Sequence, residues 1–251
     1  MFIVYSPSYF PGEDTVTRKN YYLQIILCLL FLGLILLVES FTRLDVWLQK
    51  LWFDSVTHDW LITGESHQQY RWIFYGGAKK AISIFAGVCG AGLLAGLLKQ
   101  QWRGLIFPCL LLLFSMAVVP ATASSGKKYT NIYCPKEITE FGGPFEYQHV
   151  LECRRPENVN KKLGRCFPAA HASGGFALMA LYFCLPHKRW LGLSIGLAAG
   201  WIMGNYQMLR GDHFFSHTLT TMILAWLLIL LVLPLANRLT AWYLRKRNCL
   251  P

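Results

Sequence analysis

Long apolar stretches separated by short polar segments dominate the chain. There are six of them, at residues 21–38, 81–98, 104–120, 172–186, 190–209 and 218–236. A helix needs about 20 residues, within a range of about 17 to 25, to cross a bilayer. Most of the stretches meet this requirement, and the fourth is short. The pattern predicts an all-α fold, a polytopic bundle of six transmembrane helices with a long outer loop between helices 3 and 4. Five spans is the alternative.

Composition supports a membrane protein. Apolar residues make up 54% of the chain and charged residues 15%, whereas soluble domains carry roughly 25% charged residues. This argues against an ordinary soluble enzyme, a disordered chain and a disulfide-stapled secreted miniprotein. The net charge of +11 comes from residues between apolar runs rather than from a solvated basic stripe. We therefore expect membrane lipids, and no nucleic acid, as partners; the oligomeric state stays open.

Basic residues near the ends of the apolar stretches predict the orientation, because Lys and Arg in short loops mark the cytoplasmic side. With six spans, four clusters fall on one side: Arg18 and Lys19, Lys99 and Arg103, Lys188 and Arg189, and Arg245, Lys246 and Arg247. Both termini are then inside and residues 121–170 outside. The first stretch lacks a small-x-small cleavage site and is typical of a retained anchor. We expect a multi-pass protein of the bacterial inner membrane whose candidate site, described below, faces the periplasm or outside.

The chain divides into two regions. Residues 1–120 form an N-terminal three-span region with an interfacial helix near 41–54, and residues 121–251 form the region with the catalytic residues and three spans. The interfacial helix is predicted because five large apolar residues share one helical face. They are Leu44, Trp47, Leu48, Leu51 and Trp52.

The outer segment contains three cysteines, Cys134, Cys153 and Cys166. An oxidising space permits one disulfide and leaves one thiol over. We expect Cys134 to pair with Cys166, although the sequence leaves the other pairings open. No C-x-x-C or His-plus-Cys spacing suggests a metal, so no metal and no other cofactor are expected.

The junction between the fifth and sixth stretches is the first candidate site. Arg210, His213 and His217 are three and four residues apart, so on a helix they share one face and can meet one ligand. Gly211 would break such a helix. A structural role for one of the two histidines is the alternative.

The second candidate site precedes the fourth stretch. Pro168 followed by small residues predicts a helix start, where free backbone N–H groups, such as that of Ala170, and the helix dipole favour an anion. His171 and Arg165 would lie at that anion site. The alternative is a capping turn with an incidental histidine. One residue from each of two basic pairs could clamp phosphate: Lys127 or Lys128, and Arg154 or Arg155. The alternative is that these residues bind lipid head groups or water, as is usual near a membrane surface.

The order of these motifs resembles the type 2 phosphatidic acid phosphatase family, which includes vanadium haloperoxidases. The likeness runs from Lys127 to about Thr221. The family's first motif, Lys, six residues and Arg-Pro, is matched by Lys127 or Lys128 with Arg155-Pro156 across a longer gap. The second, Pro-Ser-Gly-His, is matched by residues 168–171. The third, Ser-Arg, five residues, His, three residues and Asp, places His213 at the histidine, Gln207 at the arginine and His217 at the aspartate.

The resemblance implies an integral membrane phosphatase that removes a terminal phosphate from a lipid phosphate or diphosphate through a phosphohistidine. His213 would attack phosphorus, and His171 would protonate the leaving group and then activate water. His217 would hold the ring of His213, and four cations would stabilise the phosphate: Lys127, Arg155, Arg165 and Arg210. Alternatives are a lipid phosphotransferase, a non-catalytic protein that binds anionic lipid, and a transporter. A rival register makes His217 the nucleophile.

Overall fold

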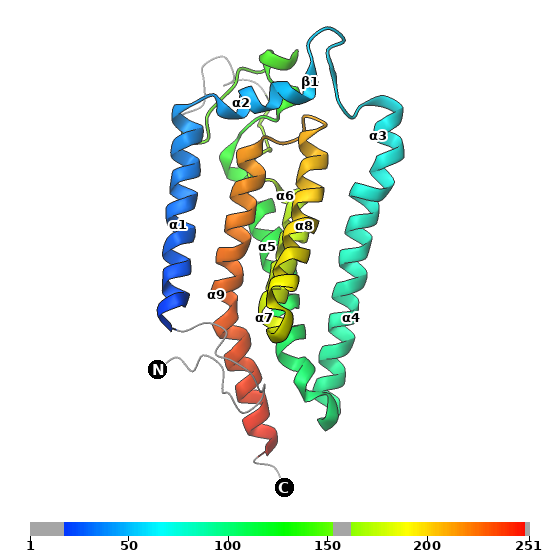
Figure 1. The fold of residues 1–251 in the computed structure, drawn as a ribbon, viewed down its shortest axis with the longest axis vertical. Coiled ribbons are helices and arrows are strands. Elements are labelled where there is room, and N and C mark those ends of the chain that lie inside the picture. Colours follow the sequence, from blue (N-terminus) through cyan, green and yellow to red (C-terminus); the bar gives the residue numbers. More distant parts are fainter. Residues whose placement is uncertain (1–17, 153–161, 249–251) are drawn as a thin grey trace.

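A computed structural model gives the fold and describes residues 18–152 and 162–248. Long helices run side by side along one axis (Figure 1). They are α1 (Arg18–Phe41), α4 (Ala78–Leu98), α5 (Ile106–Thr130), α8 (Arg189–Met208) and α9 (Phe215–Asn248). A shorter rod begins with α6 (Ala170–Ala177) and continues through the 3-10 turn Leu178–Ala180 into α7 (Leu181–Cys184). The short helix α3 (Gly64–Arg71) leads through a π-helical turn, Trp72–Gly77, into α4.

Four helices among the described residues are long and apolar enough to cross a membrane. They span Lys19–Phe41, Trp72–Leu98, Gln100–Glu137 and Phe215–Arg247. The fourth stretch of the sequence is again short, as the apolar helix Ala170–Cys184. The fifth stretch, α8, is not among the four helices, since it is rich in glycine and ends in polar residues such as Asn205 and Gln207. The sequence pattern of apolar runs is therefore confirmed as helices, with four of them meeting the length and composition of a span.

The core lies where α5, α6, α8 and α9 meet. Its fully buried side chains include Leu111, Phe176 and Ile229. Glycine allows α6 and α8 to pack backbone to backbone, since a Cβ on Gly175 would lie 2.5 Å from the nitrogen of Gly200. Small residues at helix contacts are typical of membrane bundles. This close packing brings the ends of four helices together at one end of the bundle.

The segment after α1 forms a cap over one end of the bundle (Figure 1). It contains α2 (Leu44–Gln49), the 3-10 turn Lys50–Trp52 and a two-stranded antiparallel hairpin of β1 (Phe53–Asp54) with β2 (Asp59–Trp60). The all-α prediction missed this hairpin, whose turn is stabilised by hydrogen bonds from Val56 and Thr57 to the carboxylate of Asp54. A helix, α2, lies within the range 41–54 where an interfacial helix was predicted, and it is shorter than that range. Trp47 on α2 and Leu51 in the turn that follows are 61% and 63% exposed, and their contact with lipid stays a prediction.

The outer segment between α5 and α6 folds into short turns, at Pro135–Glu137 and Thr139–Phe141. A disulfide joins Cys134 to Cys166, whose Cα atoms are 5.1 Å apart. The pairing expected from the sequence is confirmed. Cys153 lies outside the described residues.

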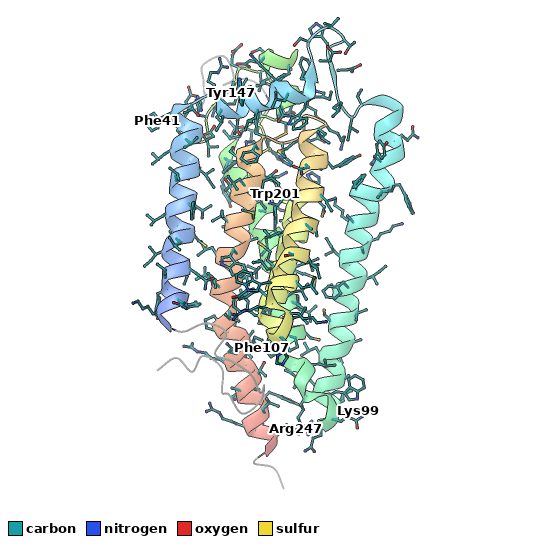
Figure 2. The ribbon with its side chains drawn as sticks, viewed as in Figure 1. Phe41, Lys99, Phe107, Tyr147, Trp201 and Arg247 are labelled. Carbon is teal, nitrogen blue, oxygen red and sulfur yellow. A yellow bond between two sulfur atoms is a disulfide. The ribbon has the colours of Figure 1, made fainter. Side chains whose placement is uncertain are left out.

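The two ends of the bundle differ in character. Figure 2 labels Lys99 and Arg247 at one end and Phe41 and Tyr147 at the other. α1 begins and α9 ends at the first of these ends (Figure 1). The hairpin, α2 and the outer segment cover the second end, where the candidate site lies.

Candidate active site

A pocket of about 470 Å³ opens where several helix ends meet. Lys127 comes from the last turn of α5, His171 from the first turn of α6, and His213 from the turn between α8 and α9. The full lining consists of Arg71, Lys127, Cys134, Lys136, Glu137, Arg165, His171, Gln207, Arg210, Asp212 and His213. Five of these eleven are Lys or Arg and two are acids, so the pocket favours an anion.

The ends of α5 and the start of α6 are held together by backbone contacts. Asn131 adopts a left-handed conformation that ends α5, as is common after a helix C-terminus. Its side chain accepts a hydrogen bond from the Gly164 nitrogen at 2.8 Å, and the carbonyl of Ile132 accepts one from the Cys166 nitrogen at 2.9 Å. Arg165 lies between Gly164 and Cys166 in the chain. The two hydrogen bonds therefore bring Arg165 beside the end of α5 that carries Lys127.

The turn from 209 to 214 replaces the helix that the spacing of Arg210, His213 and His217 suggested. α8 ends at Met208 and α9 begins at Phe215. Gly211 has a φ of +67°, and its nitrogen donates to the carbonyl of Met208. A left-handed glycine stops an α-helix, so the prediction of one helical face was wrong. The turn nevertheless brings Arg210 and His213 to the same pocket.

Two histidines face each other in the pocket. Nδ1 of His171 lies 3.3 Å from Nε2 of His213. His213 is 1% exposed, and burial, followed by the nearby charge of Lys127, holds the pKa of His213 well below its usual range. His213 is therefore neutral at pH 7, as a nucleophilic imidazole must be.

The other ring nitrogen of His213 faces a sulfur. Nδ1 lies 3.4 Å from Sγ of Cys166, which is bonded to Cys134. A disulfide sulfur has no hydrogen and can only accept, weakly. We assign the Nδ1–H tautomer to His213 on this contact, which leaves the lone pair of Nε2 toward the pocket and His171.

His217 lies behind His213 in the first turn of α9. Its ring is 1% exposed and edge-on to the His213 ring, with centroids 6.0 Å apart. Nδ1 of His217 has no hydrogen-bond partner among the described residues. The described contact with His213 is thus one of packing, and a role for His217 in fixing the tautomer stays a prediction.

One group of possible metal ligands lies at the same place. Cys166, His213 and His217 each offer a ligand atom, and these atoms lie within 4.8 Å of one another. The sulfur of Cys166 is part of the disulfide, and a metal ligand would have to be a thiolate. Two imidazoles remain, fewer than a typical zinc site uses, so this group does not fit a metal while the disulfide is intact.

Arg210 is held in place by two neighbours. Its guanidinium donates to Oε1 of Gln207 at 3.1 Å and pairs with the carboxylate of Asp212 at 2.9 Å. Asp212 also binds Nζ of Lys136 at 2.6 Å. Gln207 is aligned with the family's arginine. Its side chain binds the guanidinium of Arg210, which therefore lies beside that position.

The other residues expected from the sequence are placed as follows. Lys127 and Arg165 line the pocket, whereas Arg155 lies outside the described residues. The nitrogen of Ala170 donates to the carbonyl of Pro168 at 2.9 Å, so its expected contact with phosphate stays a prediction.

Several pocket residues escaped the sequence analysis. Arg71 and Lys136 line the pocket, and Lys79 on α4 adds positive charge to the surroundings of His171. One signal was available for Cys134, because Cys134-Pro135 follows Lys127 after six residues, the spacing of Lys and Arg-Pro in the family's first motif.

Comparison with known proteins gives one match. The sequence profile described as PAP2 superfamily matches residues 108–241, just over half of the chain. The matched region includes Lys127, His171 and His213 and leaves out α2, the hairpin and α3. Searches of curated proteins and of solved structures gave no match.

Proposed function

Because the chain belongs to the PAP2 superfamily, whose membership indicates a phosphatase acting on phosphate esters, we propose that it removes the terminal phosphate of a lipid phosphate or lipid diphosphate through a phosphohistidine. The observation that carries this proposal is the pair of imidazoles 3.3 Å apart in a cationic pocket. Nε2 of His213 supplies the lone pair for attack once substrate takes the place of its contact with His171, and His171 then supplies the proton for the leaving oxygen.

In the first step, Nε2 of His213 attacks phosphorus. The P–N bond forms and the bond from phosphorus to the leaving oxygen breaks. His171, which enters this step as the imidazolium beside the bound anionic phosphate, gives that oxygen a proton and becomes neutral. In the second step, His171 takes a proton from water, and the water oxygen attacks phosphorus. The P–N bond breaks, inorganic phosphate leaves, and His213 is restored.

The cations of the pocket supply the electrostatic stabilisation. Lys127, Arg165 and Arg210 line one pocket with the two histidines, where they can bind the equatorial oxygens of the phosphoryl group. Removing one such preorganised donor typically lowers kcat by about 10²–10³. Gln207 and Asp212 fix the guanidinium of Arg210, so little rearrangement is needed during the reaction.

A lipid substrate is favoured by the position of the pocket. It lies at the ends of apolar helices, at the level where a membrane lipid carries its head group. We further propose six spans, with α6–α7 and α8 as the two short ones, and a site on the outer side. The basic residues Lys99 and Arg247 lie at the opposite end (Figure 2), which the positive-inside rule assigns to the cytoplasm. The disulfide suits an oxidising outer compartment.

The test is phosphate release by the detergent-purified protein from a panel of lipid monophosphates and diphosphates. His213→Ala and His171→Ala should each abolish release. His187→Ala is the matched control, because His187 is exposed at the connection between α7 and α8. Release that survives in His213→Ala would overturn the proposed nucleophile. Label moving from one lipid to another without phosphate release would identify a phosphotransferase, and lipid binding without either reaction a non-catalytic binder.

A further inference from the structure

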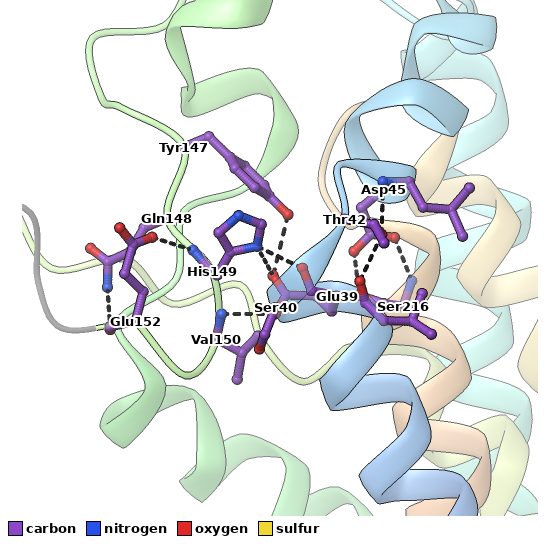
Figure 3. Close-up of polar contacts among 12 residues, drawn as sticks. Glu39, Ser40, Thr42, Asp45, Tyr147, Gln148, His149, Val150, Glu152 and Ser216 are labelled. Carbon is purple, nitrogen blue, oxygen red and sulfur yellow. Dashed lines mark hydrogen bonds and ion pairs between the residues drawn. The ribbon is translucent and has the colours of Figure 1, made fainter.

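The turn that carries His213 is held at both ends by one short helix. Nε2 of Gln49, on α2, donates to the carbonyl of Met208, the last residue of α8, at 2.6 Å. The carboxylate of Asp45, also on α2, accepts hydrogen bonds from the nitrogen and from the hydroxyl of Ser216 (Figure 3), in the first turn of α9. The two contacts bracket residues 209–215.

These contacts follow from the orientation of α2. Asp45 and Gln49 are four residues apart and so share one helical face. Both are buried, at 5% and 1% exposure, while Trp47 on the other side is 61% exposed. The side of α2 with Asp45 and Gln49 therefore faces the protein, together with the buried Val46. This buried side meets the turn with His213.

The hairpin after α2 adds a third contact with the same turn. A Cβ on Gly211 would lie 2.3 Å from a ring atom of Trp60, so the indole packs directly on the glycine. The nitrogen of Ile62 donates to the carbonyl of Leu209 at 3.2 Å. Residues 44–62 therefore contact the turn along its length.

Asp45 acts as a helix cap supplied by another element. Its carboxylate receives two hydrogen bonds at the N-terminus of α9, where the helix dipole also favours a negative charge. Burial raises the pKa of Asp45 to about 6, against the lowering effect of the bonds from Ser216; Glu39 raises it further and His149 lowers it. Protonation near pH 6 would weaken the two hydrogen bonds from Ser216, while it removes the larger cost of burying the charge.

The same region is tied to the outer segment. The hydroxyl of Tyr147 donates to Glu39 at 3.2 Å, and the nitrogen of Val150 donates to it at 3.0 Å (Figure 3). Nδ1 of His149 lies 2.6 Å from the carbonyl of Glu39. These contacts fix the end of α1, and α2 begins five residues after Glu39. α2 is therefore held in place where it contacts the turn.

We propose that Asp45 and Gln49 are positioning residues for catalysis, which hold the turn so that Nε2 of His213 faces His171. The inference rests on the proposed function, and it concerns residues that the match to the family, which begins at residue 108, does not include. His213 is three residues before Ser216, so a shift of the first turn of α9 moves its ring. A misplacement of about 1 Å of a reacting group can lower a rate about 10²-fold.

The test compares Asp45→Asn and Gln49→Leu with Lys50→Gln, a control on the exposed side of the same segment. We expect kcat to fall about 10- to 100-fold in both test variants, with KM changed less than about threefold. The double variant of Asp45→Asn with Ser216→Ala should lose no more than the stronger single variant. In the unaltered protein, kcat should fall as the pH is lowered through about 6. This fall should be absent from the pH profile of Asp45→Asn.

Orthovanadate binding separates the two proposals. If the unaltered protein binds orthovanadate but releases no phosphate, the hydrolase proposal fails, and weaker orthovanadate binding by Asp45→Asn and Gln49→Leu still supports positioning. If both variants keep the kcat and the orthovanadate affinity of the unaltered protein, the positioning role is overturned. Should Asp45→Asn fail to fold, Asp45→Glu takes its place: it keeps the charge and moves the carboxylate away from both Ser216 donors, and unchanged kcat in that variant overturns the role of Asp45.

Discussion

The Sγ atom of Cys166 lies 3.4 Å from Nδ1 of His213, on the opposite edge of the imidazole from the 3.3 Å contact with His171. A structural disulfide and the proposed nucleophile are therefore in direct contact. The same sulfur is 3.0 Å from the carbonyl oxygen of Asp212. The disulfide therefore packs against the side of the His213 ring that faces away from His171, and it also joins the two ends of the outer segment.

Reduction of this disulfide should impair both stability and turnover. The bond closes a loop with a sequence separation of 32, so its loss should lower the free energy of unfolding by about 3 to 4 kcal/mol. We expect kcat to fall at least about tenfold, because His213 loses its rear contact and Arg165 its anchor at Cys166. Thermal unfolding and phosphate release, with and without a phosphine reductant, measure the two effects.

The control for reduction is Cys28→Ser, which changes a free buried cysteine in α1 far from the pocket. It should respond to the reductant as the unaltered protein does. The variant with Cys134→Ser and Cys166→Ser should reproduce the reduced protein. Full activity in that double variant would show that the position of His213 does not depend on the disulfide.

Arg210 and Gln207 should differ in their effect on turnover. Arg210→Ala removes the guanidinium that lines the pocket and should lower kcat by about 10²–10³. Gln207→Ala removes only a hydrogen bond to it and should lower kcat by about tenfold or less, because the ion pair with Asp212 remains. Steady-state kinetics on one lipid phosphate measure both, and the reverse ranking would assign the phosphate contact to Gln207.

Gly211→Ala should destabilise the turn. The residue has a φ of +67°, and an added Cβ would meet the ring of Trp60. Left-handed backbone at a non-glycine residue costs about 1 kcal/mol or more, and the overlap with the indole adds to it. Thermal unfolding should show a lower Tm and phosphate release a lower kcat. Gly87→Ala, where no atom lies within 4 Å of an added Cβ, should leave both unchanged; equal effects would mean that Trp60 moves aside freely.

Stability should depend on pH through Asp45. Its pKa is about 6 in the folded protein, raised from 3.8, so the folded state holds the proton more tightly. The stability linked to this proton is fully present below pH 3.8 and is lost as pH rises through about 6. The shift of about 2 pKa units corresponds to about 3 kcal/mol.

Asp45→Asn isolates this term, because it cannot titrate. Between pH 4 and pH 7 the Tm of the unaltered protein should fall relative to that of the variant. His213, whose pKa is lowered, acts in the opposite direction: its contribution is present above its unfolded pKa and is lost as pH falls. A Tm difference between protein and variant that stays constant with pH would show that Asp45 does not titrate in this range.

The apolar runs were readable from the sequence because a span needs a minimum number of consecutive apolar residues, and this is a local property. The positions of the two candidate histidines near helix ends were readable for the same reason. His171 follows a proline at a helix start, and His213 lies between two apolar runs. Cys134 and Cys166 were paired by their place in the outer segment. These features depend on neighbours in the chain or on the compartment.

Tertiary structure decided the rest. Arg210 and His213 lie in a turn rather than on one helix, because Gly211 has a left-handed backbone conformation. Arg71 and Lys136 line the pocket because the packing of the helices brings their segments to it. No local pattern reveals that Asp45 caps a helix about 170 residues later in the chain. Periodicity reports which face of a helix meets lipid, water or protein; which other segment lies against that face depends on how all the helices pack, and that is a property of the folded chain.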